Sequence, residues 1–352
     1  MVTVTLGRHR VDCVGRCPGV ASLTPMDRRS FLLGAAGGSL ISPPVALAQT
    51  GKPAARIGFL SPASASDTRM QGLLDAFRQG LVELGYVEGR GFTIESRWAE
   101  EHYERLPRLA AEVVPAKVDV ILAVAVPAIR AAKEATKTIP IVMAAVVDAE
   151  ATGLVTSLSR PGGNVTGLSN MTPEVITKQL EMLKQILPKA SLFAVLWNPG
   201  NPGNPPQLRA AEGAGRTLGV RILALEARRP DDFDHAFATM AQQRAEALVV
   251  LADVMLIQER ARLVDLAFAH RLPAVYGQDA FPDGLVAYSA STRDLFRRSA
   301  TFVDRILKGA KPGDLPIERP TRFELTINLK AARSLGLTIP PSLLLRADQV
   351  IE

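Results

Sequence analysis

Cysteine is almost absent from this sequence. The chain has 352 residues and two cysteines, Cys13 and Cys17, both near its start. The rest of the chain therefore has neither a thiol nucleophile nor a disulfide framework. A lone C-x-x-x-C spacing without a second pair of ligands is a weak signal for a metal site, so we expect none there.

Histidine is scarce as well, and the motifs of the common catalytic sites are missing. After residue 48 the histidines are His102, His235 and His270, which are too far apart in sequence for metal-ligand spacing. The H-E-x-x-H, G-x-S-x-G, P-loop and G-x-G-x-x-G patterns do not occur. We therefore expect a protein that binds no metal and no cofactor and that is not an enzyme.

A strong charge of one sign is also lacking. The formal net charge is +6, and the five arginines and two aspartates of residues 1–48 account for +3 of it. Aromatic residues make up 5% of the chain and are not interleaved with a dense Lys/Arg block, which disfavours a nucleic-acid partner. With 22% charged residues, the chain is too polar for a multi-span membrane protein.

The first 48 residues read as an export signal with an upstream extension. Arg28-Arg29-Ser30-Phe31-Leu32 follows Met26, and the apolar run 31–41 is too short to remain as a membrane-spanning helix. Ala46-Leu47-Ala48 fits the small-x-small cleavage rule. The arginine pair resembles the twin-arginine export motif, and the general secretory route is the alternative.

This signal predicts a mature protein that begins near Gln49 and is soluble in the periplasm. Translation can start at Met1 or at Met26, and the sequence leaves that choice open. No cysteine follows the predicted cleavage site, so we expect no lipid anchor there.

Strand-like and helix-like patterns alternate after the leader. Apolar runs predict strands near 56–60, 92–97, 118–124 and 139–145, and helical spacing of apolar residues predicts helices between them. The run 118–124, which is apolar except for Asp119, implies that helices cover both faces of the sheet. Strict alternation predicts an α/β fold with a doubly wound parallel sheet.

The same order of patterns returns about 130 residues further along the chain. Leu192–Trp197 followed by Asn198 corresponds to 56–60 followed by Ser61, and 272–276 corresponds to 139–143. Such self-similarity predicts an internal duplication, and hence two doubly wound, Rossmann-like lobes. A single large Rossmann-type domain is the alternative.

The stretch Arg160–Asn170 lies between the two halves and contains Pro161-Gly162-Gly163, which interrupts regular structure. We interpret it as a hinge. The predicted N-terminal lobe is then 49–163 together with part of the tail, about 290–352. The predicted C-terminal lobe is 164–289.

The candidate binding residues follow from position in these two sheets. Ligands of open α/β sheets lie outside the carboxyl ends of the strands, and two facing sheets would line a cleft between lobes with those ends. Hydroxyl, amide, carboxylate and aromatic groups there suit a small polar or zwitterionic ligand, although Ser, Asn and Asp are also common in turns. The candidates are Ser61, Ser64, Val126, Asp148, Asn198, Asp253 and Tyr276.

Seven segments resemble a known family, the ABC-transporter substrate-binding proteins of the tryptophan/tyrosine-type group. They are Ile57–Pro62, Glu83–Arg90, Ala132–Ile141, Ser159–Gly167, Val195–Pro199, Phe323–Lys330 and Leu335–Pro341. The resemblance implies the type I periplasmic-binding-protein fold and a receptor that delivers its ligand to an ABC permease. It also implies that Ser61, Val126, Asp148 and Asn198 match the family's cleft positions.

One departure from the family concerns the ligand. Members often have Gly-Thr-Pro after the third strand, where this chain has Ala125-Val126-Pro127. The missing hydroxyl removes an expected hydrogen bond to a ligand carboxylate, so an aromatic acid competes with an amino acid as the expected ligand.

The resulting hypothesis is an exported, monomeric solute receptor that closes two lobes over a small carboxylate or amino-acid-like ligand. Two alternatives remain. One is an exported hydrolase that uses cleft carboxylates such as Asp148 and Asp253, although no activated nucleophile accompanies them. The other is a domain that senses a ligand and reports it to a membrane partner.

Overall fold

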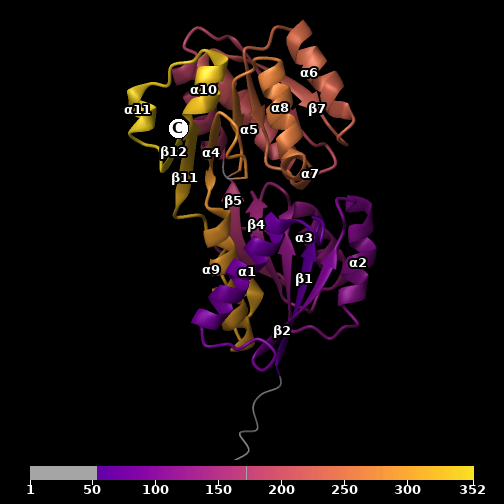
Figure 1. The fold of residues 1–352 in the computed structure, drawn as a ribbon. Coiled ribbons are helices and arrows are strands. Elements are labelled where there is room, and N and C mark those ends of the chain that lie inside the picture. The colour runs from indigo at the N-terminus through magenta and orange to yellow at the C-terminus, as the bar shows by residue number, and fades with distance from the viewer. Residues whose placement is uncertain (1–53, 172, 279) are drawn as a thin grey trace, which may run out of the picture. The chain divides into compact units, whose positions relative to one another are not determined.

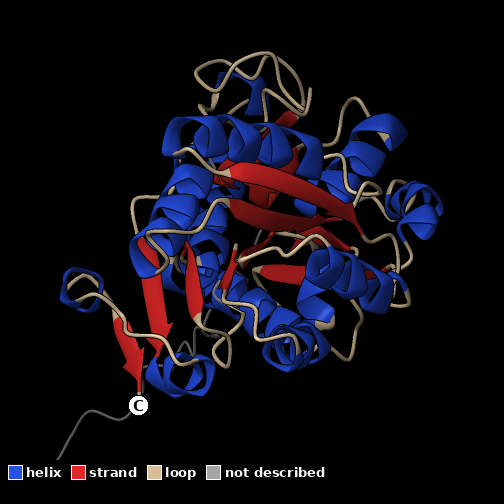
Figure 2. Ribbon diagram, turned by 90° about the horizontal axis from the view of Figure 1, so that it is seen from above, coloured by secondary structure: helices blue, strands red, loops and turns tan. Residues whose placement is uncertain are grey.

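Two separate sheets organise the described part of the chain. The computed structural model describes residues 54–171, 173–278 and 280–352, and the predicted export signal at 1–48 lies outside these ranges. One sheet has five strands and the other has seven, so the alternative of a single large sheet is wrong. Helices cover both faces of each sheet (Figures 1 and 2).

The first lobe is built on a wholly parallel sheet with the strand order β2-β1-β3-β4-β5. Its elements are β1 (Ala55–Ser61), α1 (Thr68–Glu83), β2 (Phe92–Trp98), η1 (Tyr103–Arg105), α2 (Leu106–Val113), β3 (Val120–Val124), α3 (Ala125–Ala135), β4 (Ile141–Val147) and β5 (Val165–Met171). Every residue of β3 is buried, as its apolar sequence predicts.

The second lobe repeats this order in β7-β6-β8-β9-β10, which confirms the predicted pair of α/β lobes. Its elements are α4 (Pro173–Ile186), β6 (Leu192–Trp197), α5 (Asn204–Leu218), β7 (Arg221–Glu226), α6 (Asp232–Gln242), β8 (Ala247–Val250), α7 (Val254–Gln258), α8 (Arg260–Ala269), β9 (Ala274–Tyr276) and β10 (Val286–Ala290).

The tail contributes to both lobes. It consists of α9 (Thr292–Leu307), η2 (Pro312–Asp314), β11 (Phe323–Asn328), α10 (Leu329–Leu335), α11 (Pro341–Leu344) and β12 (Gln349–Ile351). Helix α9 packs beside α1 on the first sheet, where Phe296 and Phe302 are wholly buried with Phe77 (Figure 1). In contrast, β11 pairs antiparallel with β10 and extends the second sheet, so the expected return of the tail to the first lobe applies to α9 and not to β11 or β12.

Local sequence signals explain the limits of the helices. The Asp67 side chain accepts hydrogen bonds from the backbone N–H groups of Arg69 and Met70, which makes it the N-cap of α1. Gly85 follows the end of the same helix with φ 90°, a conformation that favours glycine. The apolar face of α1 then packs against the first sheet.

The expected hinge at Arg160–Asn170 is wrong, because Val165–Met171 forms β5, the edge strand of the first sheet. Its backbone is tied to the segment that returns from α9, for example by Ser169 N–H to the Glu318 carbonyl at 3.0 Å. Gly167 allows the close approach of β5 to β4, since a Cβ there would lie 2.4 Å from the Met143 carbonyl oxygen. The chain therefore leaves the first sheet after β5, beyond the predicted hinge.

Within the described ranges, no helix combines the length and the apolar character that a membrane span requires.

Candidate functional site

A small cavity lies where the carboxyl ends of strands from both sheets meet. Its volume is about 30 Å³. The lining residues are Ala125, Val126, Val147, Asn170, Asn201, Ala252, Asp253, Val254 and Gln278. They follow or end β3, β4 and β5 in the first lobe and β6, β8 and β9 in the second. This is the location at which doubly wound sheets bind ligands.

Asp253 is the polar centre of this site. The residue is 2% exposed, and its side chain caps α7 by accepting hydrogen bonds from Met255 N–H at 3.0 Å and Leu256 N–H at 3.2 Å. The amides of Asn198 and Asn201 also donate to it, at 3.3 and 2.9 Å. Burial raises the pKa of the Asp253 carboxyl, and these donors oppose that rise.

A fifth hydrogen bond reaches Asp253 from the other lobe. The Tyr103 hydroxyl, on η1, donates to Asp253 Oδ2 at 2.9 Å. Burial and the adjacent carboxylate raise the pKa of Tyr103 well above its ordinary value, so this phenol stays protonated and donates. The carboxylate therefore has hydrogen-bond donors from both lobes.

Further contacts join the lobes beside the cavity. Gln258 donates a side-chain hydrogen bond to Asp67, and the Arg69 guanidinium donates one to the side-chain oxygen Oε1 of Gln278 at 3.2 Å. Val126 faces the backbone of the second lobe, because a Cβ placed on Gly203 would lie 3.0 Å from Val126 Cγ2. The lobes are thus in direct contact around the cavity.

Asn170 carries an unsatisfied acceptor into the cavity wall. The residue is 6% exposed, and its Oδ1 has no hydrogen-bond partner among the described atoms. Buried polar side chains are rarely left unpaired in native proteins, so this oxygen is a candidate contact for a bound group that donates a hydrogen bond. An ammonium or amide group of a ligand meets that requirement.

The structure brings three of the seven predicted residues together. Val126 and Asp253 line the cavity, and the Asn198 amide contacts Asp253 from behind while its carbonyl oxygen accepts from Gly200 N–H at 2.9 Å. All three are less than 4% exposed. Their role in binding a ligand remains a prediction.

The other four predicted residues have local partners. The hydroxyl of Ser61 accepts from Ala63 N–H at 3.2 Å, and that of Ser64 donates to Glu100. The Asp148 carboxylate accepts from Ala151 N–H at 3.0 Å, which is turn chemistry. Tyr276 is 1% exposed and stacks on Phe281 with ring centroids 4.2 Å apart.

Sequence reasoning missed Tyr103, Asn170, Asn201 and Gln278. The spacing Asn198-Pro-Gly-Asn201 could have suggested Asn201, because two amides in one turn after β6 can reach the same group. Asn170 was hidden by the hinge interpretation of its segment. Tyr103 carries no local signal, since only the contact between lobes gives its hydroxyl a role.

The acid–base pair that a hydrolase would need is not assembled here. Among the residues that the structure describes, the cavity wall contains a single carboxylate, Asp253, and Asp148 is not part of that wall. No cluster of three or more His, Cys, Asp or Glu side chains suited to a metal ion occurs within the described ranges.

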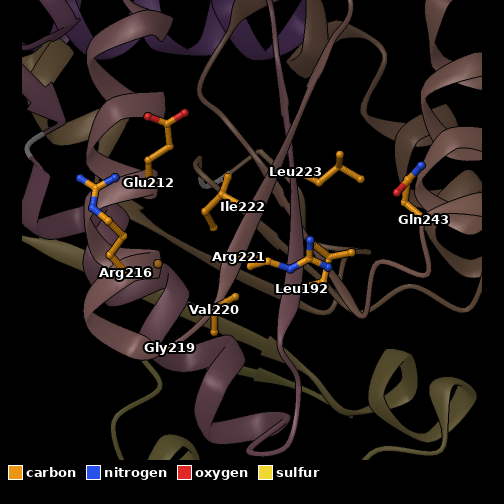
Figure 3. A pocket seen from close by; sticks show the side chains of 10 residues that line it. Leu192, Glu212, Arg216, Gly219, Val220, Arg221, Ile222, Leu223 and Gln243 are labelled. Carbon is orange, nitrogen blue, oxygen red and sulfur yellow. The ribbon is translucent and has the colours of Figure 1, made fainter.

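A larger hollow of about 550 Å³ lies elsewhere on the second lobe (Figure 3). Glu212 and Arg216 of α5 and Arg221 of β7 border it, next to the starts of β6 and β7. These are the amino ends of the strands, opposite to the edge at which such sheets bind ligands. Its size alone does not make it the candidate site.

Comparison with known proteins places this architecture in a family. Residues 61–351 match the family described as ABC transporter substrate binding protein. A tyrosine-binding protein of Clostridioides difficile is 25% identical over 263 residues, which cover 74% of this chain and 75% of that protein.

Two solved structures have the same arrangement of lobes. The ABC domain from Streptococcus pneumoniae in complex with L-Trp has a TM-score of 0.79 at 26% identity, over 85% of this chain and all of that one. A conserved domain protein from Vibrio cholerae has a TM-score of 0.78 at 27% identity, over 84% of this chain and 99% of that one. The family match spans most of the chain, and this protein therefore belongs to the ABC transporter substrate-binding proteins.

Proposed function

We propose that this protein is an exported receptor of an ABC importer that captures an amino acid with an aromatic side chain between its lobes. The receptor closes over the ligand, carries it unaltered and releases it to a permease in the cytoplasmic membrane. Binding of the ligand at the junction of the two lobes shifts the equilibrium between the open and closed arrangements toward the closed one.

The unpaired Asn170 oxygen beside Asp253 is the observation that carries the ligand class. Both groups line one cavity, where the Asn170 oxygen is an acceptor that suits an ammonium group. The oxygens of Asp253 already accept five hydrogen bonds, so this carboxylate contributes its negative charge beside that acceptor. Among its described lining residues the cavity has no basic side chain, so a ligand with only a carboxylate would meet Asp253 without a compensating cation. This favours an amino acid over the aromatic acid that Val126 had suggested.

The relatives support an aromatic side chain. One is a tyrosine-binding protein, and another was solved in complex with L-Trp. Both cover about three quarters or more of this chain. We therefore propose L-tryptophan or L-tyrosine as the first ligands to test.

The cellular part of the proposal rests on the sequence. The arginine pair, apolar run and Ala46-Leu47-Ala48 of residues 1–48 support export to the periplasm with cleavage near Ala48. The permease partner follows from the family, and a monomer is the form proposed for the receptor. For the lobes, we propose 49–171 with α9 as the first and the rest of the chain after residue 171 as the second, in line with the sheet membership of β5 and β11.

A thermal-shift experiment tests the ligand. L-tryptophan, L-tyrosine, tryptamine and indole-3-propionate would each be added at about 1 mM. Preferential binding to the native state raises the melting temperature, by several degrees when the ligand is well above its Kd. We expect L-tryptophan or L-tyrosine to do so, and indole-3-propionate, which lacks the ammonium group, to have little effect.

The result can contradict the proposal in two ways. A larger shift with indole-3-propionate than with either amino acid would identify an aromatic-acid receptor instead. Recovery of the bound amino acid in chemically altered form, read by mass spectrometry, would move the protein to the class of enzymes.

A further inference from the structure

Tyr103 differs from the other donors to Asp253 in where it comes from. Asn198, Asn201, Met255 and Leu256 all belong to the second lobe, so the four hydrogen bonds they donate are formed within that lobe. Tyr103 lies on η1 of the first lobe. Its hydrogen bond is therefore the only one of the five that separation of the lobes must break.

The two oxygens of the carboxylate share these donors unequally. Among the residues that the structure describes, Oδ1 accepts from Asn198 and from both backbone N–H groups, whereas Oδ2 accepts only from Asn201 and Tyr103. Loss of Tyr103 thus leaves Oδ2 with one donor, although the carboxylate stays anchored to its own lobe. A hydrogen bond to a charged, buried acceptor is stronger than one between neutral groups.

We infer that Tyr103 is a positioning residue that couples closure of the lobes to the cavity-lining carboxylate of Asp253. In the open form, the four donors of the second lobe position the Asp253 carboxylate. The Tyr103 hydroxyl adds the fifth hydrogen bond to that carboxylate only when the lobes close. The contact then holds the closed form together around the bound molecule.

This assignment has a kinetic consequence, which rests on the proposed function. If the ligand binds first to the second lobe, the Asp253 carboxylate is already positioned by donors of that lobe. Removal of the Tyr103 hydroxyl therefore leaves the association rate constant unchanged. The closed complex, however, loses one of the contacts that keep it shut. Dissociation therefore becomes faster, by roughly tenfold for one charge-assisted hydrogen bond.

The chain offers a matched control. The Tyr86 hydroxyl donates to Asp304 Oδ1 at 2.9 Å, the same chemical contact at the same length. It joins the end of α1 to α9 on the first lobe, away from the cavity wall. Tyr103→Phe and Tyr86→Phe thus remove the same group from an equivalent partner, in one case between the lobes and in the other within one.

The first measurement uses L-tryptophan as the probe, in stopped-flow binding to the full chain. Tyr103→Phe should raise the dissociation rate constant roughly tenfold with an association rate constant within about twofold of the unmodified protein. Tyr86→Phe should change neither rate constant. Unchanged dissociation in Tyr103→Phe, or equal changes in both variants, would overturn the inference.

The second measurement needs no ligand. Cysteines for spin labelling are introduced by Arg108→Cys in the first lobe and Arg228→Cys in the second, and Cys13 and Cys17 are replaced by serine. Pulsed electron paramagnetic resonance then measures the distance between the two labels, and hence between the lobes. Both arginine side chains are at least 65% exposed, so the labels disturb little. Tyr103→Phe should increase the population with separated lobes, and Tyr86→Phe should not.

The two measurements separate the two hypotheses. If the unmodified protein binds neither L-tryptophan nor L-tyrosine, the proposed ligand is wrong, and the distance measurement still decides the role of Tyr103. Equal distance distributions in all three proteins would then show that this hydroxyl does not contribute to closure.

Discussion

At the scale of the residue, Asn170 holds a buried polar group that lowers the stability of the fold. Its side-chain carbonyl oxygen has no hydrogen-bond partner among the described atoms, which costs about 1–3 kcal/mol relative to a satisfied group. Most buried polar groups of the described chain avoid that cost. Asn164, for example, donates from its amide to the carbonyls of Thr136 and Ile139 at 3.1 and 2.9 Å.

The contrast between these two asparagines gives a prediction. Asn170→Ala should leave the free energy of unfolding of the ligand-free protein within about 1 kcal/mol of the original or raise it, because an unsatisfied acceptor is removed. The same change should weaken L-tryptophan binding by about tenfold or more, since the proposed ammonium loses its acceptor. Urea unfolding and isothermal titration calorimetry measure the two effects.

Asn164→Ala is the control and should behave in the opposite way. It should lower the free energy of unfolding by about 1–2 kcal/mol, because two carbonyls lose their donor, and leave the affinity for L-tryptophan unchanged. A destabilised Asn170→Ala variant with full affinity would assign Asn170 to the framework and not to the site.

At the scale of the element, two strands of the second sheet are joined at their starts by a side chain, in addition to the backbone hydrogen bonds between strands. The Glu246 carboxylate precedes β8 and accepts from the backbone N–H groups of Ser191 and Leu192, at 2.6 and 3.1 Å, where β6 begins. The Ser191 N–H is the main reason that the pKa of Glu246 lies below its ordinary value. The charged carboxylate thus ties two neighbouring strands together.

This tie predicts a stability effect that depends on pH. A depressed folded-state pKa contributes stability above the ordinary pKa of a glutamate, and the contribution disappears as the pH falls through the folded value. Glu246→Gln should therefore be less stable than the original protein at pH 7, by about 0.5–1 kcal/mol for an exposed carboxylate, and the difference should vanish in acid. Urea unfolding between pH 7 and pH 3 measures it.

Glu226→Gln separates this effect from a loss of surface charge. The carboxylate of Glu226, at the end of β7, contacts the exposed Arg228 guanidinium at 3.1 Å. Exposed pairs of this kind contribute little, so its substitution should change stability by less than about 0.5 kcal/mol at any of these pH values. If the stability difference between Glu246→Gln and the original protein persists at pH 3, the backbone contact of the Glu246 carboxylate is not its cause.

The elements themselves were largely predictable from sequence, and the reason is local. An apolar run such as 120–124 or the Asp67 cap of α1 encodes a strand or a helix start within a few residues. The strand-end argument also selected Val126 and Asp253 correctly as residues at the carboxyl ends of their strands. Periodicity does not encode sheet membership, however, so the sequence of β5 does not show that it pairs with β4.

The remaining site residues could not be found in this way, because their roles arise between elements. Tyr103 acquires a partner 150 residues away only when two lobes meet, and Asn170 matters only because β5 ends at the same cavity as β8. For Asp148 and Ser61, a role in binding a ligand stays a prediction. Each lies at a strand end as predicted, but its side chain satisfies the adjacent turn.

The whole molecule combines two lobes whose cores are filled from different parts of the chain. The core of the first lobe includes Phe296 of α9, which is wholly buried against residues of α1 and β1. The core of the second lobe includes Phe237 of α6, which is also wholly buried. The two side chains are chemically identical and differ only in the lobe that they stabilise.

This pair predicts how each lobe opens. Phe296→Ala and Phe237→Ala should each cost about 3–5 kcal/mol, as removal of a buried phenylalanine does. Phe296→Ala should speed hydrogen exchange most in β1 and β3, and Phe237→Ala should speed it most in β6 and β8. Mass spectrometry of exchange in peptides from the four strands measures this, and identical patterns for both variants would show that the lobes unfold as one unit.

Helix α9 also constrains the order in which the protein can fold as it is made. The first 171 residues contain every strand of the first sheet, but the hydrophobic layer under α1 lacks Phe296 and Phe302 until residue 307 has left the ribosome. Domains usually fold as units and from the N-terminus onward during synthesis. In this protein the core of the N-terminal lobe can be completed only after the strands of the C-terminal lobe up to β10 have been synthesised. The N-terminal lobe of a nascent chain therefore remains incompletely packed until synthesis is almost finished.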